Sequence, residues 1–363
     1  MAGAVHLPYR YLGKSGLKVS SLCLGTMTFG QQEGCRPGQS NEVLSHQLLD
    51  QYIGAGGNFI DTADIYQHGL SERIIGQYFV KRPELRSKMI IATKVFGPME
   101  RDDVNARGLS RHHIMQAAEQ SLHRLNSDYI DLYQVHCWDD GTPLEETLRA
   151  LNDLVVCGKV RYVGVSNVTG WQFQKIIDMG RQLGLNQIVS NQAQYNLLCR
   201  STEWEIMEVC KREGVACLPW SPLKGGLLTG KFQRDREISE DPESSRVAWV
   251  EADKSRSNQS HPSLQQWADR EMFWGLTDTL GDIAVAHEAS VAQVAIAWLL
   301  HKPTVASVVI GARNAAQLND NLQAANLRLS QDELDLLDKK SEIELPYPYE
   351  MVFRMQRGRE RDT

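Results

Sequence analysis

Four side chains that could exchange protons stand at or near the ends of short apolar runs. Asp61 and Tyr66 lie in the stretch FIDTADIY, and Lys94 lies in MIIATKV. His136 ends the stretch YIDLYQVH. A tyrosine phenol has a pKa near 10 in water, too high for efficient proton transfer at neutral pH, and burial alone raises it further. A lysine ammonium about 4 Å away would stabilise the phenolate by about 4 kcal/mol at an effective dielectric constant near 20, which is about three pKa units.

Each of these residues has a role in such a scheme. Lys94 would lower the pKa of Tyr66 toward neutrality, and Asp61 would keep Lys94 charged inside a desolvated site. His136 would orient a substrate oxygen or assist the proton transfer. Asp64, in the same stretch as Asp61, is interpreted more simply as a solvated loop carboxylate.

The elements that must position these residues alternate along the chain. Eight strand-like apolar runs are each followed by a helical pattern. They are the run ending at Gly25 and the runs at 59–60, 89–95, 129–136, 160–167, 187–192, 215–223 and 306–311. Apolar runs in strict alternation with helices predict parallel strands that are buried on both faces.

Two parallel architectures fit this order, a doubly wound open sheet and a closed (β/α)8 barrel. The count of eight, the length of 363 residues and the uniform composition favour the barrel. The first strand also lacks the GxGxxG motif that an open dinucleotide-binding sheet would carry. We therefore expect one α/β barrel domain over residues 1–363, with its core at about 9–340. It should have an N-terminal β-hairpin, a long loop at about 233–280 after strand seven, and a C-terminal helix with an irregular tail at about 341–363.

Active-site groups in such a barrel come from the carboxyl ends of the strands and the loops that follow. A polar or aromatic side chain at one strand end has an ordinary explanation, because strand ends border solvent. Seven such ends in register predict a functional rim. The residues at these positions are Asp61, Tyr66, Lys94, His136, Ser166, Asn167, Gln192, Trp220, Ser221 and Gly311 to Arg313.

Composition argues against several classes of function. The chain is 42% hydrophobic and 23% charged, which is typical of a soluble globular protein. Its net charge of −6 disfavours nucleic acid or an anionic membrane as a partner. No apolar run reaches the roughly 18 to 20 residues needed to cross a bilayer, and the N-terminus lacks a secretory pattern. The seven cysteines are scattered and never form CxxC, so we expect reduced thiols, a cytoplasmic location and no metal site. The sequence is compatible with a homo-oligomer.

Several motifs together resemble those of the aldo-keto reductase superfamily. DTADIY is similar to its Asp-x-x-x-x-Tyr element, ATK to its strand lysine and VHCWD to its strand histidine. GVSN, SNQAQYN and WSPLKGGLLTGK resemble its nicotinamide-binding and cofactor-loop segments. LGTMTFG resembles its first strand-end loop, and GARNAAQLNDN its adenosine-binding segment. The match runs in order from about residue 9 to 340. It resembles the branch of bacterial stress-type reductases and potassium-channel β subunits more than the mammalian aldose-reductase branch.

This resemblance implies NADPH-dependent reduction of an aldehyde or ketone, a small-molecule substrate, to an alcohol. The implied catalytic tetrad is Asp61, Tyr66, Lys94 and His136, in which Tyr66 protonates the carbonyl oxygen as the nicotinamide delivers hydride to the carbon. The implied cofactor-binding residues are Gly25, Thr26, Met27, Asp61, Ser166, Asn167, Gln192, Trp220, Ser221, Pro222, Leu223, Gly226, Lys231, Gly311, Arg313, Gln317 and Asn321.

Within that set, the resemblance implies that Ser166, Asn167 and Gln192 hydrogen-bond the nicotinamide carboxamide. Trp220 would stack on the nicotinamide ring. The pyrophosphate side would be lined by Ser221, Leu223, Gly226 and Lys231. The adenosine would be contacted by Gln317 and Asn321.

Cofactor preference depends on Arg313, which by the resemblance would pair with the 2′-phosphate of NADPH. This sequence departs from the family's pattern beside it. Many members carry Lys-Ser where this chain has Gly311 and Ala312, and an arginine where it has Gln317. Because one guanidinium can still hold a phosphate through two hydrogen bonds, we expect NADP(H), with NAD(H) less favoured.

Three other functions fit the sequence less well, and the third of them is the main alternative. GGLLTGKF nearly spells a P-loop, but Phe232 stands where a P-loop has Ser or Thr for magnesium. A lyase or aldolase would use Lys94 as a Schiff base, which needs a neutral lysine, whereas Asp61 favours the charged form. A regulatory subunit that binds NADPH and reports redox state to a partner protein would keep the same tetrad.

The loops leave questions of their own. The excursion at 233–280 is either a mobile segment that folds over bound cofactor or a disordered surface insertion. The tail either crosses the catalytic face or reaches a neighbouring subunit. Phe29, Trp138 and the tail aromatics are candidates for lining an apolar substrate pocket, with ordinary packing as the alternative.

Overall fold

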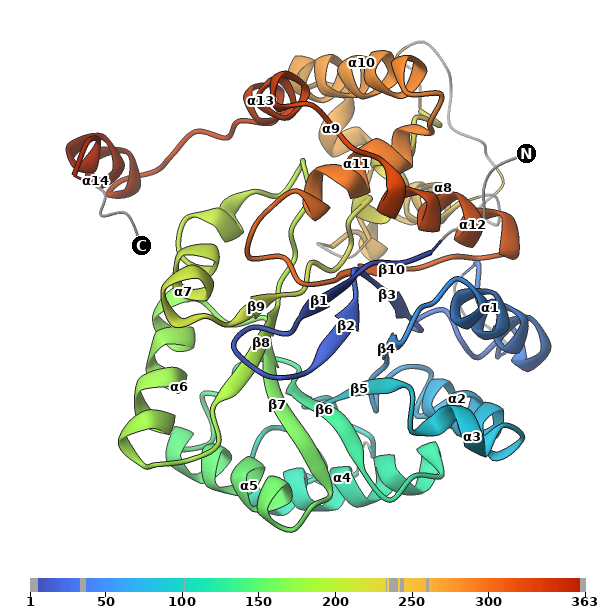
Figure 1. Ribbon diagram of the computed structural model, residues 1–363, viewed down its shortest axis with the longest axis vertical. Coiled ribbons are helices and arrows are strands. Elements are labelled where there is room, and N and C mark those ends of the chain that lie inside the picture. The colour runs from blue at the N-terminus through green and yellow to red at the C-terminus, as the bar shows by residue number, and fades with distance from the viewer. Residues whose placement is uncertain are drawn as a thin grey trace.

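A ring of eight parallel strands forms the centre of the molecule (Figure 1). The computed structural model describes residues 6–32, 37–100, 102–232, 234, 241, 245–258 and 261–359. The strands are β3 (Leu22–Gly25), β4 (Phe59–Asp61), β5 (Ile90–Val95), β6 (Ile130–Val135), β7 (Val160–Ser166), β8 (Ile188–Gln192), β9 (Ala216–Cys217) and β10 (Val308–Ile310). They pair in the order β10-β3-β4-β5-β6-β7-β8-β9.

Hydrogen bonds between the two ends of this sheet close it into a barrel. Cys217 N donates to Thr304 O at 2.8 Å, and Ala306 N donates to Cys217 O at 3.1 Å. Further along, Val309 N donates to Pro219 O at 2.9 Å. The predicted (β/α)8 barrel is confirmed. A closed barrel brings the carboxyl ends of all eight strands to one rim.

An antiparallel hairpin precedes the first barrel strand, as expected from the sequence. Its strands are β1 (Tyr9–Tyr11) and β2 (Lys18–Ser20). Leu12 and Val19 are buried and pack with the side chains inside the barrel, among them Phe59. The hairpin therefore covers the amino end of the barrel, opposite the rim where the strands end.

Helices surround the strands and bury a second apolar layer against them (Figure 1). Those that alternate with strands are α1 (Glu42–Gly54), α2 (Leu70–Val80), α4 (Arg111–Leu125), α5 (Leu144–Val156), α6 (Gly170–Gln182), α7 (Ile206–Glu213), α11 (Val291–Leu300) and α12 (Ala315–Gln323). The additional ones are α3 (Pro83–Arg86), α8 (Arg246–Glu251), α9 (Gln265–Ala268), α10 (Glu271–Ala286), α13 (Gln331–Lys340) and α14 (Tyr349–Gln356). Short polar side chains start several of them: Ser110, Ser290 and Asn314 each accept a hydrogen bond from the backbone of the first helical turn.

The long excursion after β9 contains packed helices in its described part. Val247 and Val250 of α8 are fully buried, and Phe273 of α10 lies in the main core. Residues 233, 235–240, 242–244 and 259–260, which belong to this excursion, lie outside the described residues. The described helices are anchored to the barrel rather than spread over its surface.

The C-terminal tail is only partly irregular, which corrects the expectation for residues 341–363. It ends in helix α14, whose Tyr349 hydroxyl donates to Glu205 Oε1 at 2.8 Å. The Tyr349 ring lies 5.2 Å from that of Trp204, so the tail packs beside the start of α7 at the outer edge of the molecule (Figure 1). This helix is hard to predict from the sequence because Pro346 and Pro348, which disfavour helix, stand directly before it. Its apolar stripe of Tyr349, Val352 and Phe353 begins only after them.

Among the described residues, no single helix is long and apolar enough to cross a membrane. Helices α10 and α11 reach that length only together, across a bend of 94°.

Candidate active site

A buried ion pair lies at the centre of the rim. Asp61 ends β4 and Lys94 lies on β5, and the two residues are 2% and 0% exposed. Lys94 Nζ donates to Asp61 Oδ2 at 2.6 Å, to the Thr62 carbonyl at 2.7 Å and to the Tyr66 hydroxyl at 3.3 Å. The ammonium thus bridges the carboxylate and the phenol, as the sequence predicted.

Two side-chain amides hold the carboxylate of Asp61 from the other side. Gln192 Nε2 donates to Asp61 Oδ1 at 2.8 Å, and Gln134 Nε2 donates to the same oxygen at 3.1 Å. Gln134 was not predicted from the sequence. Its position on β6, two residues before His136 on the face that points into the barrel, could have indicated it.

Tyr66 and His136 stand together above this pair. Tyr66 lies in the turn after β4, and its ring meets that of His136 edge to face at 5.9 Å. His136 follows β6 and its backbone N–H donates to Val95 O at 3.0 Å, which fixes the loop against β5. An imidazole and a phenol therefore face the same space, with a lysine beneath them.

Burial acts on the pKa of both basic groups of the site. Burial by itself lowers the pKa of Lys94, but the negative charge of Asp61 and the interaction with Tyr66 outweigh it, so the pKa is raised and the ammonium stays charged. Burial, with help from the charge of Lys94, lowers the pKa of His136 to about 3. His136 is therefore neutral at physiological pH and can donate from one ring nitrogen while it accepts at the other.

Above the tetrad lies a cavity of about 220 Å³. Its lining is Gly25, Thr26, Met27, Thr28, Asp61, Tyr66, His136, Ser166, Asn167, Gln192, Trp220, Ser221, Arg246, Val309, Ile310 and Gly311. Asn167 has a left-handed backbone and its Nδ2 donates to His136 O at 2.9 Å, so the ends of β6 and β7 are tied together. The indole N–H of Trp220 is buried and has no hydrogen-bond partner among the described residues.

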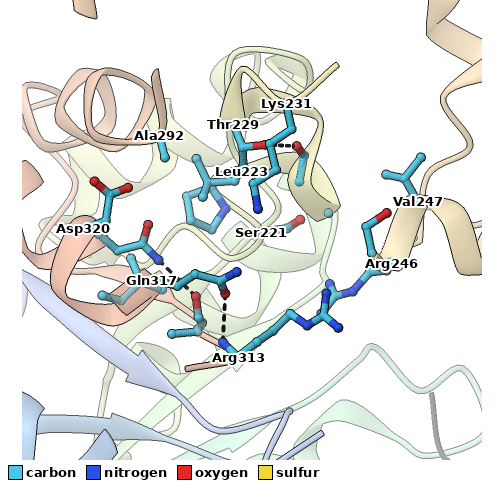
Figure 2. Close-up of a pocket in the computed structure, with 18 of the residues that line it drawn as sticks. Ser221, Leu223, Thr229, Lys231, Arg246, Val247, Ala292, Arg313, Gln317 and Asp320 are labelled. Atoms are coloured by element: carbon cyan, nitrogen blue, oxygen red, sulfur yellow. Dashed lines mark hydrogen bonds between the residues drawn. The ribbon is translucent and has the colours of Figure 1, made fainter. Parts of the chain in front are cut away.

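A second cavity of about 290 Å³ adjoins the first and shares five lining residues with it (Figure 2). The shared residues are Thr28, Ser221, Arg246, Ile310 and Gly311. The predicted cofactor residues Pro222, Leu223, Gly226, Lys231, Arg313, Gln317 and Asn321 line this cavity too. Every residue predicted to bind cofactor thus lines one cavity or the other, and of the tetrad only Lys94 lies beneath the surface.

The second cavity has a cationic mouth. Arg313 enters it from the start of the α12 segment and Arg246 from α8 in the excursion (Figure 2). Gln317 Oε1 accepts from Arg313 N at 3.0 Å, which fixes the backbone that carries the guanidinium. Arg246 was not predicted from the sequence, because a lone arginine in a polar excursion carries no periodic signal.

These cavities suit a dinucleotide by the chemistry of their walls. Hydroxyl and amide groups surround the smaller one, and the cations Lys231, Arg246 and Arg313 surround the larger. Gly226 has φ of +111°, and a Cβ there would project into open space within the cleft. Backbone without a side chain beside cations is the arrangement that lets a phosphate approach closely.

Several predicted positions lie elsewhere. Asp64 is wholly buried, so its interpretation as a solvated carboxylate is wrong: the turn after β4 directs it toward α2 rather than toward solvent. Phe29 is 1% exposed and packs in the core rather than lining either cavity. Trp138 pairs edge to face with Trp171 at 5.6 Å, outside the lining of both cavities. The near P-loop forms a 3-10 turn over Lys224–Thr229 rather than a strand, loop and helix.

Within the described residues, no group of three or more His, Cys, Asp or Glu side chains could hold a metal ion.

Related sequences identify the family of this protein. Residues 21–342 match the aldo/keto reductase family. The uncharacterized oxidoreductase YrpG of Bacillus subtilis is 35% identical over 92% of this chain and 95% of its own length. Versiconal hemiacetal acetate reductase of Aspergillus parasiticus is 33% identical over 92% and 96%. Protein tas of Escherichia coli is 34% identical over 90% and 96%. This protein belongs to the aldo/keto reductase family.

Proposed function

We propose that this protein reduces an aldehyde or ketone to an alcohol with NADPH, as a single-domain cytoplasmic enzyme. The observation that carries the proposal is the Lys94 ammonium between Asp61 and the Tyr66 hydroxyl, at the floor of a cavity that opens into a cationic cleft. The tetrad residues and the contacts to cofactor are part of this proposal.

The chemistry of each residue follows from its surroundings. Reduced nicotinamide, when bound, supplies the hydride that the carbonyl carbon receives. Tyr66 donates its hydroxyl proton to the carbonyl oxygen, and Lys94 stabilises the phenolate that remains. Asp61 keeps Lys94 charged. Neutral His136 donates a hydrogen bond that orients the substrate oxygen.

A Schiff-base mechanism fits Lys94 poorly. Its ammonium makes three hydrogen bonds and is wholly buried, while a Schiff base needs an accessible neutral amine. Borohydride trapping with a carbonyl compound should leave Lys94 unlabelled. Covalent labelling of Lys94 would contradict the reductase mechanism and support a lyase mechanism.

Steady-state assays with NADPH and NADH against a panel of aldehydes and ketones test the proposal directly. Multiple turnovers with at least one carbonyl compound are expected. Lack of turnover across the panel, with cofactor bound, would count against the enzyme.

A redox-sensing subunit is the second candidate. One observation favours it: Arg246 and Val247 of the excursion wall the larger cavity, so bound cofactor would be covered and would leave slowly. A sensor should oxidise one equivalent of NADPH and then stall, whereas the enzyme continues. The same covering supports the interpretation of the excursion as a lid, and deleting part of it should then speed cofactor release.

Replacing Arg313 with Ala should weaken the binding of NADPH much more than that of NADH. Charge-assisted hydrogen bonds contribute roughly 1.5–3 kcal/mol, so the Kd for NADPH should rise about 10- to 150-fold while that for NADH stays within about twofold. Quenching of tryptophan fluorescence on binding measures both values. Arg246→Ala is the matched contrast: Arg246 lines both cavities, so its loss should weaken both cofactors together. Equal effects of Arg313→Ala on the two cofactors would exclude Arg313 as the 2′-phosphate ligand.

Turnover should show no acidic limb near neutral pH. With its pKa lowered to about 3, His136 is already neutral at pH 5 and gains no proton until far lower pH. The kcat of the reduction should therefore be level between about pH 5 and 7. A limb near pH 6.5 that disappears in His136→Gln would show that the imidazole titrates in the working enzyme.

A further inference from the structure

Asp64 is a buried acid that the mechanism above does not use. Its side chain is 0% exposed, and it lies two residues before Tyr66 in the turn after β4. Oδ1 accepts a hydrogen bond from Ile65 N at 2.6 Å. Oδ2 is buried and has no hydrogen-bond partner among the described residues. A carboxylate so poorly compensated is costly, whereas a neutral carboxyl group is tolerated.

The groups around Asp64 oppose its ionisation. Glu72 on α2 is also wholly buried and adds a second negative charge near Asp64. Arg124 on α4 forms a 2.6 Å ion pair with Glu72 rather than with Asp64. Lys94 on β5 is committed to Asp61, and Tyr133 on β6 presents a buried hydroxyl that lacks a partner among the described residues. Burial and then the charge of Glu72 raise the pKa of Asp64 to about 8, against weaker opposing effects of Arg124 and Lys94.

The same turn carries Tyr66 through an unusual backbone path. Gln67, His68 and Gly69 follow it with φ of 49°, 52° and 83°, three consecutive left-handed residues. Such conformations persist only where the surroundings impose them. A Cβ at Gly69 would lie 2.5 Å from the Arg124 side chain, so the turn rests directly on the ion pair that borders Asp64.

We infer that Asp64 is a positioning residue for Tyr66: its neutral carboxyl group fills the space under the turn, and loss of its proton loosens the turn and withdraws the phenol. The inference rests on the proposed function, because Tyr66 is the proton donor there. Ionisation would add a negative charge beside Glu72, whose own charge is already paired with Arg124, and the turn would relax toward its exposed side at His68.

The rates of carbonyl reduction and of alcohol oxidation together distinguish ionisation of Asp64 from ionisation of Tyr66. Deprotonation of Tyr66 slows carbonyl reduction but favours alcohol oxidation, where Tyr66 acts as the base. A loosened turn slows both. We expect kcat in both directions to fall as pH rises through about 8, at constant Kd for NADPH. Asp64→Asn keeps the shape and cannot ionise, so it should hold kcat within about threefold at pH 6.5 and remove the fall in the oxidation direction. Asp64→Ala, which leaves the space empty, should lower kcat at every pH.

Asp131→Asn is the matched control, because Asp131 is another buried carboxylate, paired with Arg86 and remote from Tyr66. It should leave the pH profile unchanged. An Asp64→Asn variant that keeps the fall in both directions, or an Asp64→Ala variant with wild-type rates, would overturn the inference.

The protonation state itself has an independent readout. Infrared spectroscopy at pH 7 should show a protonated carboxyl absorption that Asp64→Asn removes, and its absence would also overturn the inference.

The pH dependence of stability is a further test of the same protonation state. Between about pH 4 and 8 the unfolded chain has lost this proton and the folded protein keeps it, so the unfolding equilibrium should shift about tenfold toward unfolding per pH unit. Asp64→Asn should remove that slope. A protein with both signatures and no turnover would defeat the proposed function and leave the buried acid in place.

Discussion

Tyr66→Phe should abolish most turnover and leave cofactor binding intact. The substitution removes only the hydroxyl, which receives a 3.3 Å hydrogen bond from Lys94 and is the proposed proton donor. Positioned proton transfer contributes about 10²- to 10⁴-fold to rate, so kcat should fall by that factor. The Kd for NADPH should stay within about twofold, because the ring still packs against His136.

Tyr349→Phe is the control for this variant. It also removes a hydrogen-bonded tyrosine hydroxyl, one that donates to Glu205 Oε1 at 2.8 Å, but at the outer edge of the molecule. It should keep wild-type turnover. Near wild-type kcat in Tyr66→Phe would mean that another group, with His136 the nearest choice, donates the proton.

Lys94→Met should damage both stability and turnover. Methionine fills a similar volume but carries no charge, so Asp61 would stay buried without its cationic partner. Breaking a buried pair from one side costs about 3–5 kcal/mol. We expect a loss of that size in the free energy of unfolding measured by urea titration, together with loss of nearly all turnover.

A second substitution separates the two effects. Adding Asp61→Asn to Lys94→Met removes the uncompensated charge, and the amides of Gln134 and Gln192 can reorient toward the new side chain. The double variant should regain much of the lost stability and none of the turnover. Lys81→Met, which breaks an exposed pair with Glu42, should leave both quantities close to wild type. Full stability in the single Lys94→Met variant would contradict a stabilising role of Lys94 toward the buried Asp61.

The pattern of strands and helices was predictable because it is written in local sequence. Apolar runs of four to eight residues that alternate with helical periodicity leave few architectures, and a closed barrel brings the ends of distant strands to one rim. That reasoning anticipated the convergence of Asp61, Lys94, Tyr66 and His136, which are up to 75 positions apart. Their geometry agrees with the prediction, and their chemical roles remain proposals.

The lining of the two cavities was predictable for a related reason. Motif residues at strand ends, such as Ser166 and Gln192, must face the same opening once the barrel closes. Arg246 was not predicted because it does not lie at the end of a strand. It reaches the cleft on α8, a helix of the excursion that is held there by the buried Val247 and Val250.

Tertiary structure alone decided which polar residues face inward. Asp61 at the end of β4 and Asp64 in the turn that follows are three positions apart, yet Asp61 pairs with Lys94 and Asp64 is buried near Glu72. Gln134 shares a strand face with His136, but only the closed barrel shows that its amide reaches Asp61 across β5. The physical reason is that burial and charge depend on neighbours supplied by remote segments. Local sequence fixes which side chains an element carries, and packing determines what those side chains meet.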